Sequence, residues 1–163
     1  MALTITWDEY HGGGEVKSDN VTNLVFGSSD SADFTPMDYP ITAGLCSYGK
    51  YVKVDFAGMA GEGVTEIQTA KIHKSAGAYV TDEVMTFDGL SVSYATPSQD
   101  SLGNSAIPTS TPGAQNLGLG GSDTGVLVAD GQSDYGLFQI ETSSSTPNGA
   151  LNNKTITVTW DQV

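Results

Sequence analysis

The chain has 163 residues, 38% of them hydrophobic and 15% charged, which predicts a single folded domain spanning residues 1–163 with a core of its own. Six lysines and no arginine face 19 acidic residues, and the formal net charge of −13 argues against nucleic-acid binding, which depends on clustered cations. No apolar run approaches the roughly 18 residues of a membrane helix, and the first residues lack the basic start and apolar stretch of a signal peptide. We therefore expect no nucleic-acid partner and no membrane contact.

The start of the chain alternates apolar and polar residues, with Leu3, Ile5 and Trp7 separated by threonines. Successive side chains of a strand point to opposite faces, so this alternation predicts a strand with one apolar face over residues 3–8. Similar alternation, or a short apolar run between turn residues, recurs along the chain. The further predicted strands span residues 20–26, 51–57, 67–74, 78–81, 90–94, 125–129, 135–142 and 156–160.

Three features of these strands bear on how they are arranged. Segment 75–77 separates two strands and contains a glycine, which is typical of a hairpin. Segment 125–129 is apolar throughout, which is typical of a strand buried on both faces. The first and last strands share a similar sequence around Trp7 and Trp160, and both tryptophans are in phase with aliphatic residues, so we expect both in the core.

Helices have little support in this sequence, because no long segment carries apolar residues at helical spacing. Residues 64–74 form the best exception, and a helix there is the alternative to the predicted strand. Strands at intervals of roughly 10 to 15 residues, separated by Gly, Pro, Asn, Asp and Ser, are typical of an all-β protein. We predict an antiparallel β-sandwich that is Ig-like or jelly-roll-like, with one long irregular loop.

That loop spans residues 97–123, which are rich in Pro, Gly and Ser and show little periodicity. Long irregular loops are uncommon inside compact domains, and ordering one costs about 1–2 kcal/mol per residue. Each apolar side chain of the loop returns about 1.5–3 kcal/mol when it is fully buried. These side chains include Leu102, Ile107, Leu117 and Leu119. We expect the loop either to be mobile or to be held against the domain or a neighbouring subunit.

Catalytic motifs are incomplete in this sequence. The segment His11-Gly-Gly-Gly14 matches the oxyanion-hole motif of lipases, but the G-x-S-x-G nucleophile elbow that accompanies this motif is missing. We interpret His11 as part of a glycine turn, and His73 as a residue on the solvated face of a strand. Paired carboxylates could support glycoside hydrolysis, but 19 acidic residues produce such pairs without any function. We assign no catalytic residue and predict that the protein is not an enzyme.

Patterns for metal binding and redox chemistry are equally weak. Acidic residues cluster in segments 28–33, 81–83 and 121–125, but none of these has a known calcium-loop pattern. We interpret all three as solvated turns, with calcium binding in a loop as the alternative, and assign no metal and no cofactor. Cys46 is the only cysteine, which excludes an intrachain disulfide, and we interpret it as a small buried hydrophobic residue.

Several short motifs carry a resemblance to a known class of proteins. They are, in chain order, Pro40–Gly44, Ser47–Tyr51, the strand 52–57, Tyr94–Pro97, Ala106–Thr109, Gly131–Tyr135 and Trp160–Val163. Taken together they resemble small β-sandwich virion proteins of tailed bacteriophages, especially capsid decoration or auxiliary proteins. The resemblance implies a structural protein that assembles in the host cytoplasm, becomes part of the virion and transfers no active-site residue to this chain.

We therefore expect a protein that binds a phage capsid surface and stabilises or decorates it without catalysis. Its partner would be the major capsid protein or another virion protein, and the long loop together with threefold virion sites favours a homotrimer. The alternative is a carbohydrate-binding or host-adhesion module of a phage tail or fibre, which would need exposed coplanar aromatic side chains. A third hypothesis, a small hydrolase, would need His11 or His73 beside a carboxylate and a nucleophile in a pocket.

Overall fold

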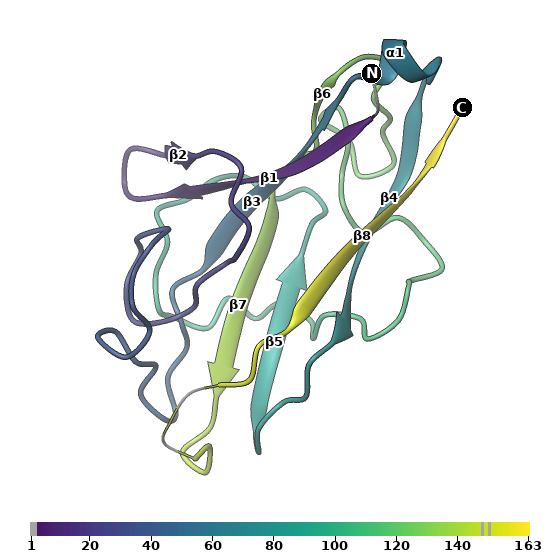
Figure 1. Ribbon diagram of the computed structural model, residues 1–163. Helices are drawn as coiled ribbons and strands as arrows, with labels where there is room; N and C mark the ends of the chain where they lie inside the picture. Colours follow the sequence, from purple (N-terminus) through teal and green to yellow (C-terminus); the bar gives the residue numbers. More distant parts are fainter. Residues whose placement is uncertain (1–2, 148, 150) are drawn as a thin grey trace.

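The computed structural model describes residues 3–147, 149 and 151–163. Two antiparallel sheets pack against each other over a common core, so the prediction of an all-β sandwich is confirmed (Figure 1). The elements in chain order are β1 (Thr4–His11), β2 (Val16–Ser18), β3 (Lys50–Ala57), α1 (Met59–Glu62), β4 (Ile67–Ala76), β5 (Glu83–Asp88), β6 (Gly131–Gln132), β7 (Gly136–Thr142) and β8 (Thr155–Gln162).

The two sheets differ greatly in width. The larger sheet has the strand order β2-β1-β3-β7-β5, and the short β6 also pairs with β3. The smaller sheet consists of β4 and β8 alone. Figure 1 shows β4 and β8 crossing the larger sheet at an angle, so that they cover only part of its face.

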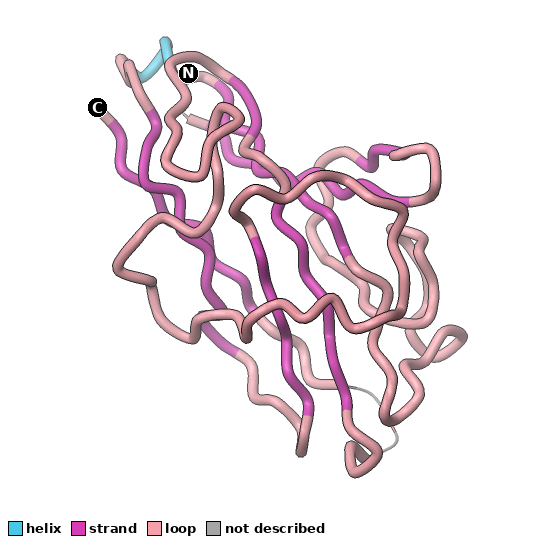
Figure 2. The backbone as a smooth tube through the Cα atoms, turned by 180° about the vertical axis from the view of Figure 1, so that it is seen from behind, coloured by secondary structure: helices cyan, strands magenta, loops and turns pink. Residues whose placement is uncertain are grey.

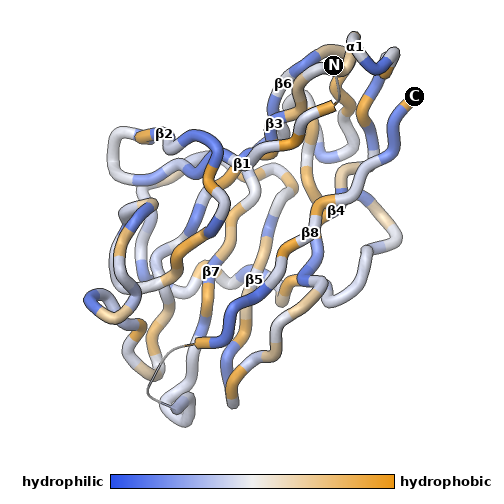
Figure 3. Tube along the Cα trace, viewed as in Figure 1, coloured by the Kyte–Doolittle hydropathy of each residue, from blue (hydrophilic) through white to orange (hydrophobic). Residues whose placement is uncertain are grey.

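Strand β3 illustrates how the alternation of the sequence builds the core. Val52, Val54 and Phe56 are fully buried between the sheets, whereas Tyr51 and Lys53 point to the opposite face of the larger sheet. Each fully buried aliphatic or aromatic side chain stabilises the fold by about 1.5–3 kcal/mol. Figure 3 shows the same change between hydrophobic and hydrophilic residues along the other strands.

The outer face of the larger sheet carries a second, smaller hydrophobic cluster. Four of its members, Tyr10, Tyr51, Tyr94 and Tyr135, are named here the tyrosine cluster. Tyr94 comes from the irregular chain that follows β5 and lies over the tyrosines of the strands. The larger sheet is therefore covered on both faces, by the smaller sheet on one side and by irregular chain on the other.

Five of the predicted strands are confirmed. Those over residues 3–8, 51–57, 67–74, 135–142 and 156–160 correspond to β1, β3, β4, β7 and β8. Four others are wrong, because residues 20–26, 78–81, 90–94 and 125–129 form no strand. The helical alternative for residues 64–74 is also wrong, since most of that segment is β4.

Tertiary packing explains why three of the predicted strands do not form. Leu24 and Phe26 pack against the core, and Tyr94 packs on the tyrosine cluster, from backbone that joins no ladder. Segment 125–129 makes one isolated bridge, between Leu127 and Ile67, and Val128 is 73% exposed rather than buried. In these segments apolar side chains pack without a continuous strand ladder, which periodicity alone does not distinguish.

The predicted hairpin through residues 75–77 is also wrong, because β4 pairs with β8 instead. Gly77 has a φ of 92°, and a Cβ atom there would lie 2.2 Å from the carbonyl oxygen of Asn153. Glycine is required at such a close backbone contact. Strand β5 follows this turn and was not predicted, because Val84 beside the buried Met85 is also apolar and the sequence lacks a clear alternation there.

The long loop over residues 97–123 packs against its own domain. Ile107, Leu117 and Leu119 are buried in the main core, so their burial offsets part of the cost of ordering the loop. The side chain of Asn116 bonds both backbone groups of Ile72, accepting from the N–H at 2.7 Å and donating to the carbonyl at 2.9 Å. Seen from behind in Figure 2, loop segments run across the strands.

Candidate functional site

A large groove lies between residues 151–156, which include the start of β8, and the irregular segments 21–26 and 36–43. Its volume of about 1480 Å³ exceeds the roughly 300–1,000 Å³ of most small-molecule pockets. Its lining is mainly uncharged and includes Trp7, Phe26, Met37, Met85, Ile140 and Ile156. We name this feature the groove, and its size and lining suit a polypeptide better than a small ligand.

The groove exists because the smaller sheet is too narrow to cover the larger one. On β3, Val54 and Phe56 are 0% exposed, whereas Ile5 and Trp7 on the neighbouring β1 are only half-buried. Irregular chain fills part of the remaining space, where the N–H of Val21 donates to the carbonyl of Trp7 at 2.8 Å. The expectation that Trp7 lies in the core is therefore met only in part, since it packs on the core and also lines the groove.

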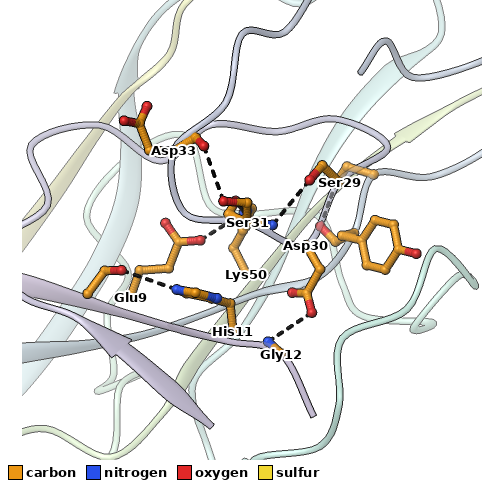
Figure 4. Close-up of polar contacts among 11 residues, drawn as sticks. Glu9, His11, Gly12, Ser29, Asp30, Ser31, Asp33 and Lys50 are labelled. Carbon is orange, nitrogen blue, oxygen red and sulfur yellow. Dashed lines mark hydrogen bonds and ion pairs between the residues drawn. The ribbon is translucent and has the colours of Figure 1, made fainter. Parts of the chain in front are cut away.

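A buried ion pair lies on the same face of β1 and β3, beyond the apolar residues. Lys50 and Glu9 are both 0% exposed, and Lys50 Nζ is 2.8 Å from Glu9 Oε1 (Figure 4). The same Nζ donates to the carbonyl of Ser31 at 2.6 Å and lies 5.4 Å from the ring centre of Phe34. Burial raises the pKa of Glu9 above its ordinary value of 4.5, against the opposing effect of Lys50. Because both side chains are enclosed, the pair can stabilise this end of the sandwich but cannot reach a substrate.

The sequence interpretation overlooked this ion pair, although the sequence carries a signal for it. Glu9 is in phase with Ile5 and Trp7, and Lys50 is in phase with the buried valines of β3. Opposite charges in core phase on two strands indicate a buried pair, because an unpaired charge in such a place is very costly.

His11 lies next to this ion pair and contacts a serine rather than a carboxylate. Its Nε2 atom is 3.1 Å from Ser18 Oγ, a contact that follows from the pairing of β1 with β2. Nearby, Asp30 accepts a hydrogen bond from the backbone N–H of Gly12 at 2.8 Å (Figure 4). In the part of the chain that the structure describes, no carboxylate bonds His11, and neither His11 nor Ser18 lines the groove. The arrangement lacks the acid that orients the histidine of a hydrolytic triad.

A second ion pair stands in the lining of the groove. Lys154 Nζ contacts Glu83 Oε1, and both side chains are almost fully buried. The ammonium of Lys154 also lies 5.3 Å from the ring centre of Tyr79. Among the described lining residues Lys154 is the only lysine, so the groove offers no cation that is free of an internal partner.

The tyrosine cluster bears on the carbohydrate-binding alternative, which needs exposed and coplanar rings. Its ring planes are inclined to one another by 47° to 89°, so they form no flat platform. The hydroxyls of Tyr10, Tyr94 and Tyr135 each donate to an oxygen atom of the same chain. Burial, with smaller effects of nearby acids, raises the pKa of Tyr94 to about 12. Both the rings and the hydroxyls of the cluster are therefore used inside the protein.

The other residues singled out from the sequence are not brought together into a site. The prediction that His73 is solvated is wrong, because it is only 8% exposed where the long loop runs along β4. Cys46 is half-buried, and its burial raises the pKa of its thiol, with Glu141 and Asp100 acting in the same direction. Within residues 3–147, 149 and 151–163, no three His, Cys, Asp or Glu side chains are grouped so that they could hold a metal ion.

Comparisons with known proteins leave the geometry as the basis for assigning a function. No protein-family model, no curated protein and no solved structure matches this chain. Among the described residues, no helix has the length and hydrophobicity needed to cross a membrane. The groove is accordingly our candidate functional site.

Proposed function

We propose that this protein is a virion structural protein that docks on a phage capsid surface and stabilises or decorates it without catalysis. The observation that carries the proposal is the groove, which is larger than a small-molecule pocket and has an apolar lining. An apolar surface of this kind, rimmed by polar residues, is typical of a protein interaction site. The proposed partner is the major capsid protein or another virion protein, and assembly takes place in the host cytoplasm.

The charge of the chain supports docking on a second protein rather than self-association. Three of its six lysines, Lys17, Lys50 and Lys154, are already paired with acidic residues of the same chain. Most of the 19 acidic residues are therefore left without a lysine partner. A surface of this charge repels copies of itself and attracts a partner with a basic surface.

The alternatives have less support. The tyrosine cluster offers no platform for a sugar, and within the described part of the chain His11 bonds a serine but no carboxylate. The hypothesis of a homotrimer loses the observation that motivated it, because the loop over residues 97–123 packs into its own domain. Light scattering of the purified protein decides its oligomeric state independently of the docking proposal.

The test is reconstitution with capsids. The major capsid protein encoded in the same genome would be assembled into shells, mixed with the purified protein and separated on a density gradient. We expect the protein to migrate with the shells at a fixed ratio that saturates, and to raise the temperature at which the shells dissociate. Recovery of all the protein at the top of the gradient would contradict docking, and binding to a glycan array instead would favour the adhesion alternative.

A further inference from the structure

Strand β8 is the long strand edge that the described part of the chain leaves uncovered. The outer edge of β5 bonds to residues 105–107, and the outer edge of β4 bonds to residues 108, 116 and 127. The outer strand β2 has only three residues. The eight residues of β8, in contrast, pair with β4 on one side and, among the described residues, with no strand on the other. Natural proteins rarely expose such an edge, because it is a template for pairing with another chain.

The pairing register shows which backbone groups of β8 point outward. Ile72 uses its N–H and carbonyl to bond Asn116, on the side away from β8. Val158 lies opposite Ile72, so this is a non-hydrogen-bonded pair of the ladder and the N–H and carbonyl of Val158 point to the open edge. The extra residue of the register shift between Gln68 and Lys71 lies on β4, so the regular alternation along β8 extends the same orientation to Ile156 and Trp160. Three residues thus present donors and acceptors along one line.

Of these three residues Ile156 lines the groove, and Val158 and Trp160 continue the same face of β8 beyond it. Ile156, Val158 and Trp160 pack against the core but are only half-buried, although Ile72 across the ladder from Val158 is 0% exposed. Threonines occupy the alternate positions of β8, and the strand contains neither proline nor lysine. From Thr155 to Trp160 the edge therefore lacks the charged residues and prolines that usually block strand addition, and at Ile156 it adjoins an apolar groove.

We propose that an extended segment of a partner protein adds to β8 as a third strand of the smaller sheet. Its backbone bonds the outward groups of Ile156, Val158 and Trp160, and its apolar side chains enter the groove over Trp7. This inference rests on the docking role proposed above and identifies how the partner is recognised. Strand addition draws its affinity from main-chain hydrogen bonds and its specificity from pockets for alternate side chains.

Charge complementarity defines the chemistry of that segment. Two exposed acidic residues, Asp38 and Asp82, lie at the rim of the groove. Asp38 follows the lining residue Met37 in the chain, and the backbone carbonyl of Asp82 accepts a hydrogen bond from the lining residue Thr146. The one lysine of the lining, Lys154, is held by Glu83. We therefore expect lysine or arginine between the apolar residues of the segment.

A second copy of this chain fits the edge less well than a single segment of another protein. The groove is lined by Trp7 of the larger sheet and by residues 21–26, so a partner that reaches β8 has to enter between parts of this chain, which a single extended segment does more easily than a whole sandwich. Two copies would also each bring a net charge of −13.

The experiment uses the whole protein and synthetic peptides. The test peptide is Lys-Ile-Lys-Val-Lys-Ile-Lys-Val-Lys with both ends capped, and one control has the same composition without alternation. A second control carries glutamate in place of lysine. Amide hydrogen exchange followed by NMR should show at least tenfold protection of Ile156, Val158 and Trp160 by the test peptide alone. Thr157 and Thr159, whose amides face β4, should exchange at an unchanged rate.

A pair of variants at one position separates edge pairing from side-chain packing. Val158→Pro removes the central outward N–H and should weaken peptide binding at least tenfold, whereas Val158→Thr keeps that N–H and should bind like the wild type. Circular dichroism checks that both variants fold. If Val158→Pro does not fold, the exchange pattern of the wild type remains decisive.

Three results would overturn the proposal. They are no protection at millimolar peptide, equal protection by the control peptides, and protection of the same amides by self-association of the free protein. Failure of this inference is distinguishable from failure of the proposed function. Capsid docking by the Val158→Pro variant at wild-type affinity would refute strand addition and leave docking intact. Peptide binding to β8 without capsid docking would refute the proposed function and leave strand addition intact.

Discussion

Replacing Lys50 by methionine tests the buried ion pair most directly. The substitution keeps a long side chain but leaves the carboxylate of Glu9, which is 0% exposed, without its cation. Removing one partner of a buried pair costs about 3–5 kcal/mol. We expect the upper part of this range, because the carbonyl of Ser31 also loses its donor. For a chain of this size the loss corresponds to a fall of about 10 °C in the melting temperature.

The cost of Lys50→Met should depend on pH in a direction that the pKa of Glu9 determines. Burial raises this pKa in the folded protein, so Glu9 contributes stability below its ordinary value of 4.5 that is lost as the pH rises. Without Lys50 the two larger of the three effects that lower the pKa of Glu9 disappear and only that of His11 remains, so the loss of stability extends to higher pH. The variant should therefore regain stability between pH 7 and pH 5, by up to about 1.4 kcal/mol per pH unit.

Urea unfolding of four proteins at both pH values measures these effects. The double variant Glu9→Leu with Lys50→Met removes both charges and should lie within about 1 kcal/mol of the wild type. Lys17→Met is the matched control, because the Lys17 side chain is 38% exposed and its buried partner Asp8 keeps the hydrogen bonds that it accepts from Asn20 and Gln132, so the loss should matter less. A cost below about 1 kcal/mol for Lys50→Met, or an equal cost at both pH values, would refute the argument from burial.

Three further predictions concern the long loop and the cysteine. Leu117→Ala should destabilise the protein by about 2–5 kcal/mol in urea unfolding, because Leu117 is 0% exposed in the core, and a change below about 0.5 kcal/mol would show that the loop is not packed. Asn116→Ala should cost about 1–3 kcal/mol and speed hydrogen exchange at Ile72, whose N–H loses its acceptor, while unchanged exchange would contradict the contact. Cys46 should react with iodoacetamide more slowly than a free cysteine at pH 8, because its raised pKa keeps the thiol protonated, and urea should abolish the difference.

Period-two patterns in the sequence were sufficient to predict the strands that form the core. In β1, β3 and β8 the local preference and the tertiary environment agree, since alternate residues face a common core. Segments 20–26 and 90–94 show the limit of this reasoning. Their apolar residues are half-buried against the two hydrophobic clusters, but the backbone joins no ladder, although the N–H of Val21 bonds the carbonyl of Trp7 in β1. A strand forms only when its side chains are buried and its backbone has a pairing partner, and local sequence predicts the first of these but not the second.

The groove could not have been predicted from the sequence for a related reason. Its existence depends on the difference in width between the two sheets, and therefore on which strands pair. The sequence predicted a partner for β4 in segment 78–81, whereas the actual partner is β8, almost at the other end of the chain. If β4 had paired with segment 78–81 in a hairpin, β8 would have been free to pair with another strand. A different part of the larger sheet would then have been left uncovered.

The distribution of covered edges argues that the open side is part of how the protein works. Ordering an irregular loop costs about 1–2 kcal/mol per residue, yet this chain uses its long loop to cover the edges of both β4 and β5. The same chain leaves β8, which is rich in threonine and carries no lysine or proline, without cover. An exposed edge of that composition invites aggregation unless something occupies it. A partner strand that arrives during assembly would complete the smaller sheet and remove this liability, and the high negative charge would keep the free protein apart from its own copies until then.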